Sequence, residues 1–82
     1  MPVPAPVEPA IFKRALEIYG FELVEEDEFN WALFKVDETP PIVTVPKEGE
    51  TISLTLMMAV LNQLKLSNSD YFSLVEQARA MP

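Results

Sequence analysis

The chain has 82 residues, of which 49% are hydrophobic, and its 13 Asp and Glu against 6 Lys and Arg give a formal net charge of −7. This length supports one domain with a modest core, and the acidic balance argues against nucleic-acid binding, which normally needs a basic face. The chain has no Cys and no His, so it lacks disulfides, thiolate metal ligands and the usual general base near neutral pH. We therefore expect no metal centre, no cofactor and no catalytic residue.

Hydropathy along the chain gives no sign of a membrane protein. No apolar run approaches the ~20 residues of a membrane-spanning helix, and the N-terminus lacks the basic and then apolar pattern of a secretory signal. The lack of Cys suits a reducing compartment. Together these features predict a cytoplasmic protein with no membrane partner.

The N-terminal stretch is rich in proline. Pro occurs at positions 2, 4, 6 and 9, which predicts a flexible arm over residues 1–9, followed by a single domain over residues 10–80. The arm is interpreted either as a solvated tail or as a ligand for a Pro-recognising domain.

A helix is predicted next, over residues 8–20. Pro9 suits the first helical turn, and Gly20 suits the left-handed position that follows a helix. The apolar side chains recur at helical spacing and predict a buried stripe of Ile11, Phe12, Ala15, Leu16 and Tyr19.

Three short strands follow, over residues 21–26, 29–36 and 42–45. In the second strand, alternation places Trp31 and Leu33 on one side and Asn30, Ala32 and Phe34 on the other. Trp31 is interpreted as sheet-face packing, with a base-stacking platform as the alternative. The turns between the strands are marked by an acidic run at 25–28 and by paired prolines at 40–41.

The strongest apolar segment is residues 51–66, which predicts the helix that covers the sheet. Thr51 or Ser53 is expected to cap its start. A stripe at helical spacing predicts core positions at Leu54, Met57, Leu61 and Leu64. A final helix is predicted from Ser67 to about Ala80, held down by Tyr71, Phe72, Leu74 and Val75.

The main helix is apolar over more than half its circumference, which one sheet face cannot bury. For Met57 and for Met58 the sequence leaves two interpretations, a core position and an interface position, since methionine packs adaptably at binding surfaces. A contiguous apolar patch on a small monomer usually marks an interaction site. We therefore predict a surface for a protein partner or for self-association, centred on Met58 and Val60.

Other candidate sites carry weaker patterns. The acidic run 25–28 is interpreted as a solvated turn rather than a cation site, because four consecutive side chains rarely converge on one ion. Glu22 and Glu48 are a second candidate, as a general acid and a general base, but nothing in the sequence places the two carboxylates together. Ser53 and Ser67 are interpreted as helix caps and not as nucleophiles, since there is no His to activate their hydroxyls.

The order helix, three strands, helix, with these junctions, resembles the HicA-type toxins. These are small mRNA interferases with a double-stranded-RNA-binding-domain-like fold. The likeness spans about residues 11–73 and is carried by three segments, which are residues 16–24 (LEIYGFELV), 40–49 (PPIVTVPKEG) and 57–67 (MMAVLNQLKLS). The resemblance implies that two helices pack on one sheet face.

Departures from the family pattern concern its chemistry. The family carries a catalytic His entering the second strand, and the aligned position here is Asn30, whose amide cannot serve as a base near pH 7. The basic residues of the family's second helix are replaced here by Met58, Ala59 and Asn62, and Glu48 stands where a basic or His residue is common. The RNA-facing charge and the catalytic base are thus missing together.

The combined prediction is an α+β domain: a helix, a three-stranded antiparallel sheet and two further helices packed on one sheet face. Its expected function is that of a non-catalytic, HicA-like protein-interaction module. The alternative is a HicA-like toxin with residual RNA binding or ribonuclease activity. A third hypothesis is an acidic, stable domain of unrelated function.

Overall fold

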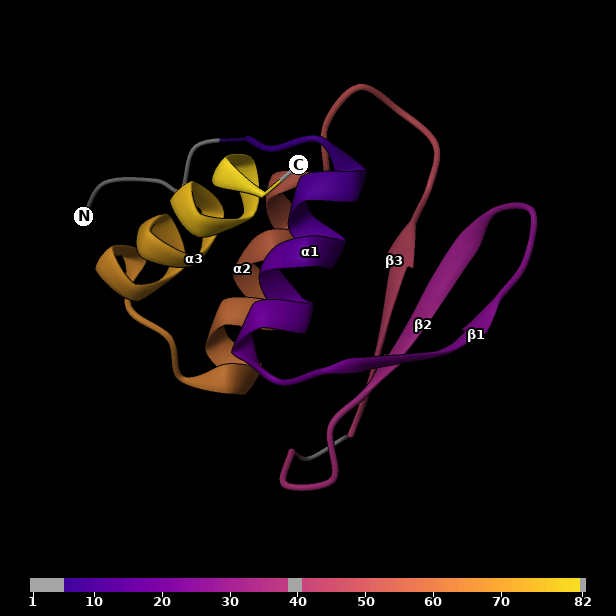
Figure 1. The fold of residues 1–82 in the computed structure, drawn as a ribbon, viewed down its shortest axis with the longest axis horizontal. Helices are drawn as coiled ribbons and strands as arrows, with labels where there is room; N and C mark the ends of the chain where they lie inside the picture. The colour runs from indigo at the N-terminus through magenta and orange to yellow at the C-terminus, as the bar shows by residue number, and fades with distance from the viewer. Residues whose placement is uncertain (1–5, 39–40, 82) are drawn as a thin grey trace.

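The computed structural model describes residues 6–38 and 41–81, and their arrangement is α+β (Figure 1). The elements in chain order are α1 (Pro9–Tyr19), β1 (Glu22–Glu26), β2 (Asn30–Phe34), β3 (Ile42–Pro46), α2 (Leu54–Leu64) and α3 (Asn68–Ala80). The strands form one antiparallel sheet in the order β1-β2-β3. The helices gather on one side of this sheet, which confirms the predicted fold class.

The sheet is centred on Leu33 of β2, which is fully buried. Leu33 lies opposite Leu23 of β1 and Val43 of β3, so three apolar side chains cross the sheet in one row on the helix-covered face. Trp31 and Val45 form a second pair on this face. In β1 the register shifts between Leu23 and Glu25, which ends the simple alternation of that edge strand.

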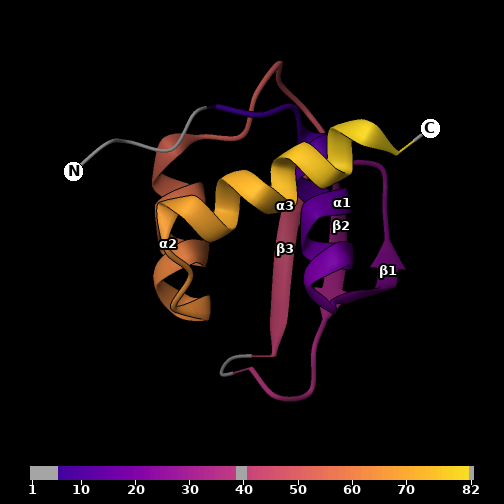
Figure 2. The same cartoon turned by 60° about the vertical axis from the view of Figure 1, so that its left-hand side comes forward.

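Two of the helices form successive layers on the sheet. α1 lies against β2 and β3, and α3 lies against α1 on the side away from the sheet (Figures 1 and 2). Tyr71 of α3 joins three elements, because its ring centroid lies 6.4 Å from that of Phe12 and its hydroxyl donates a hydrogen bond to Met57 Sδ at 3.1 Å. A single core therefore connects all three helices to the sheet.

Local chemistry sets the helix ends largely as predicted. Gly20 follows α1 with φ 131°, a conformation that side chains rarely adopt. The Ser53 hydroxyl accepts a hydrogen bond from the Leu56 backbone N–H, so Ser53, not Thr51, caps α2. The Ser67 hydroxyl caps α3 in the same way by accepting from the Asp70 N–H.

The N-terminal segment corrects one prediction. Residues 7–9 are packed into the domain, although they belong to the predicted flexible arm over 1–9. The Val7 side chain is 1% exposed, and its backbone carbonyl accepts a 2.8 Å hydrogen bond from the Ile52 N–H. Glu8 forms an ion pair with Arg79 of α3. The sequence did not predict this packing, because one valine between prolines shows no periodicity. The other residues of the predicted arm, 1–5, lie outside the described part of the chain.

The last helix also differs from its predicted packing. Tyr71 and Val75 are buried and Leu74 is partly buried, but Phe72 is 58% exposed. Ala78 takes the next core position instead, because 71, 75 and 78 lie on one helical face and 72 does not. Within residues 6–38 and 41–81, no helix combines the length and apolarity needed to span a membrane.

Val7→Ala is expected to lower the free energy of unfolding by about 2 kcal/mol, because it removes two buried methyl groups and leaves a small cavity. Val36→Ala makes the same change at a side chain that is 75% exposed, and it should alter stability by less than about 0.5 kcal/mol. Urea denaturation of the two variants measures both effects. Equal midpoints would show that the N-terminal segment does not contribute to the core.

Tyr71 is expected to make the fold sensitive to alkali. Burial raises the pKa of Tyr71 to about 12 from its ordinary value of 10.0. Because the unfolded chain releases this proton near pH 10 and the folded chain retains it, stability should be fully present below pH 10 and should fall as the pH rises towards 12. Thermal melts should therefore show a steeper loss for the native chain than for Tyr71→Phe. Parallel losses in the two proteins would contradict the assignment.

Candidate functional site

Asn30, the position of the family's catalytic His in the resemblance, lies at the start of β2 among carboxylates. Its backbone N–H donates a 2.7 Å hydrogen bond to Asp27 Oδ1, which also accepts from the Phe29 N–H at 2.8 Å. These two N–H groups, that of Phe29 first, hold the pKa of Asp27 below its ordinary value. The cleft at this position has a volume of about 200 Å³ and is lined by Glu25, Asp27, Asn30, Ala32 and Thr44. It therefore presents carboxylates to any ligand and contains no imidazole.

Five of the six basic residues have partners elsewhere in the described part of the chain. Four of the six Lys and Arg residues form ion pairs, which are Lys13–Glu17, Lys35–Asp37, Lys47–Glu26 and Arg79–Glu8. Arg14 donates instead to the backbone carbonyls of Ala78 and Met81, at 3.4 Å each. Phosphate binding needs several cations that converge without local partners, and this arrangement does not supply them.

Trp31 packs on the helix-covered face of the sheet. The Nζ atoms of Lys13 and Lys47 each lie 5.5 Å from the centroid of its ring, and the ring also packs against the core. Lys47 additionally bonds Glu26 at 2.6 Å and lowers the pKa of that carboxyl. Since lysines and core atoms surround the indole, this environment favours the packing interpretation of Trp31 over a base-stacking platform.

Of the two residues at the centre of the predicted interaction surface on α2, Met58 is exposed and Val60 is buried, so Val60 cannot belong to such a surface. Val60 is only 4% exposed and belongs to the core, because it shares a helical face with Met57 and Leu64. Met58, one residue beyond the buried Met57, is 46% exposed. Leu54, predicted from its spacing as a core residue, is instead 43% exposed and lies one turn before Met58. The i, i+4 spacing of these two residues was the signal that could have identified the pair. We call Leu54 and Met58 the α2 surface.

The carboxylates considered in the sequence do not form a site. Glu22 lies on β1 opposite Phe34, at one end of the sheet, whereas Glu48 follows β3 beyond the opposite end. Within the acidic run, Glu26 turns to Lys47 and Glu25 lies opposite Ala32. Among the described residues, no group of three acidic side chains is placed to hold a metal ion.

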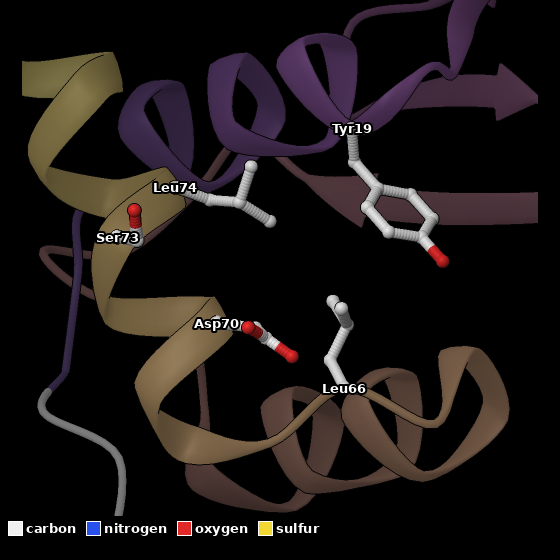
Figure 3. Close-up of a pocket in the computed structure, with 5 residues that line it drawn as sticks. All are labelled: Tyr19, Leu66, Asp70, Ser73 and Leu74. Atoms are coloured by element: carbon white, nitrogen blue, oxygen red, sulfur yellow. The ribbon is translucent and has the colours of Figure 1, made fainter.

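A further pocket lies between α1, the α2–α3 connection and α3 (Figure 3). Its volume is about 340 Å³, and its lining residues are Tyr19, Leu66, Asp70, Ser73 and Leu74. The two leucines and the tyrosine ring border the space, and Asp70 supplies its only carboxylate. This lining resembles the edge of a protein core and lacks an acid–base pair.

Comparison with known proteins does not assign the chain to a family: no family model, curated protein or solved structure matches it.

Asn30→His is expected to remain inactive as a ribonuclease at neutral pH, like the native chain. The new imidazole would lie beside Glu25 and Asp27, where phosphate is repelled and no cation converges. Incubation of both purified proteins with labelled RNA measures this directly. Cleavage that survives repurification and disappears in a second point variant of the same protein would overturn the expectation.

Proposed function

We propose that this chain is a non-catalytic protein-interaction module, organised like the HicA-type toxins and lacking their chemistry. The observation that carries the proposal is the α2 surface, where Leu54 and Met58 leave two large apolar side chains one turn apart on the outside of a helix. Burying such side chains against a partner contributes roughly 25 cal/mol per Å² of apolar area, before the costs of association.

The sequence around this surface supports binding to protein. Between Leu54 and Leu64 the only strongly polar residues are Thr55, Asn62 and Gln63, so the helix has no charged face. Met58 adds a flexible, polarisable side chain that can adapt to different apolar partners. The alternative function, residual RNA binding, has less support, because the cleft at Asn30 is acidic and four of the cations are paired.

Salt dependence separates the two functions experimentally. RNA binding releases counterions and weakens steeply as the salt concentration rises, whereas contact through an apolar helix surface changes little. A partner complex or a self-association that persists from 50 to 500 mM salt, over which the screening length shortens roughly threefold, favours the interaction module.

Met58→Glu is expected to weaken self-association or partner binding while the thermal melt stays unchanged, since a charge is tolerated at an exposed site and not in a desolvated interface. Ala59→Glu is the matched control, because it adds the same charge at the next exposed position of α2 and should leave association intact. Leu61→Glu should abolish the cooperative melt, because it puts an unpaired carboxylate into the core. Light scattering and calorimetry measure the three variants.

The outcomes of this comparison are distinct. If Met58→Glu collapses the melt as Leu61→Glu does, Met58 is a core residue and the proposed surface fails. If Met58→Glu and Ala59→Glu weaken association equally, the effect is one of net charge and the α2 surface is not the contact.

A further inference from the structure

The face of the sheet opposite the helices is not covered by any described element (Figure 1). Antiparallel pairing places the side chains of directly opposed residues on the same face. The residues that alternate with the buried Leu33 and Val43 therefore point to the uncovered side. We call this surface the open face, and its residues are Glu22, Glu25, Ala32, Phe34, Ile42 and Thr44.

One end of the open face is apolar. Phe34 and Ile42 are direct cross-strand neighbours, and Ile42 remains 51% exposed. Val36, just beyond β2, is 75% exposed. An aromatic and a β-branched residue side by side on a sheet normally pack under another layer, and here none of the described elements supplies one.

The β1 edge of the open face is negatively charged. Glu22 lies beside Phe34, and Glu25 lies beside Ala32, so each apolar or small residue of β2 has a carboxylate next to it. Neither carboxylate has a hydrogen bond or ion pair among the described residues. Asp27 adds a third negative charge at the cleft that contains Glu25.

Two of the lysines near the sheet lie on its other face. Lys13 and Lys47 flank Trp31, which shares the helix-covered face with Leu33. Lys35 lines a cleft of about 270 Å³ together with Glu22 and Phe34, and its Nζ lies 5.8 Å from the centroid of the Tyr19 ring and pairs with Asp37. Lys13 and Lys47 thus lie on the helix side of the sheet and Glu22 and Glu25 on the open side, with Lys35 at the end of the sheet near Glu22.

We propose that the open face binds a basic amphipathic segment of a partner protein. Apolar side chains of the segment would cover Phe34 and Ile42, and its Lys or Arg side chains would pair with Glu22 and Glu25. Charge complementarity selects this occupant. A second copy would bring the same carboxylates into face-to-face repulsion, and a nucleic acid would be repelled by them. This surface is separate from the α2 surface and does not depend on it.

The test uses a peptide of about 14 residues that carries Leu on one helical face and Lys on the other, and a matched peptide in which Gln replaces each Lys. Binding to the full chain is followed by calorimetry and by backbone amide shifts. The double variant Glu22→Gln, Glu25→Gln should weaken binding of the Lys peptide roughly 3- to 30-fold. Glu48→Gln, Glu50→Gln changes net charge equally in a loop outside the sheet, and it should have less than about a twofold effect.

A third variant tests the apolar part. Ile42→Thr keeps a β-branched residue in β3 and removes apolar surface, so it should weaken both peptides while the melt is unchanged. The proposal is supported if the Lys peptide shifts amides of β1 to β3 and the Gln peptide binds more weakly. It is overturned if the two glutamate double variants lose affinity equally, if the shifts map to α2, or if RNA shifts the same amides. It is also overturned if light scattering shows a dimer that Ile42→Thr dissociates, because the occupant is then a second copy.

Discussion

The fold depends on burial of one face of a small sheet. Leu33 is fully buried at the centre of β2, between Leu23 and Val43, and α1 must cover this row for the strands to be stable. An 82-residue chain has enough helix for one such layer, and α3 then packs behind α1. The second sheet face and the outer side of α2 are consequently left with apolar side chains in contact with solvent. Both candidate interaction surfaces follow from this single constraint.

Charge follows the same division of the molecule. On the helix side, lysines extend over Trp31 and pair with Glu17 and Glu26, so their positive charge is neutralised locally. Such exposed pairs add little stability individually, but they fix where the cations lie. The remaining carboxylates of β1 face the other way, without partners in the described residues. Glu22, Glu25 and Asp27 therefore place negative charge on the side of the sheet that contains Asn30, and this charge disfavours phosphate there.

The two surfaces differ in what they can recognise. The α2 surface consists of Leu54 and Met58 on a helix whose described part carries no charge between Leu54 and Leu64, so contact there is governed by shape and apolar area. The open face combines Phe34 and Ile42 with Glu22 and Glu25, so it discriminates by charge as well. The two proposed surfaces lie apart, since α2 and the open face are on opposite sides of the sheet (Figure 1).

Periodicity and capping chemistry determined the element order, the antiparallel sheet and most of the core, because alternation in β2, the stripe at Met57, Leu61 and Leu64, and Gly20 are local features. The lack of His and the net negative charge are the basis for predicting that the chain lacks the chemistry of the HicA-type toxins that it resembles. Only the tertiary structure decided the positions at the border of a helical stripe. Val60 and Leu54 exchanged their expected places, because burial there depends on the angle at which α2 meets its neighbours. It also decided that Val7 enters the core and that Glu22 and Glu25 share a face, since both depend on contacts between segments far apart in the chain.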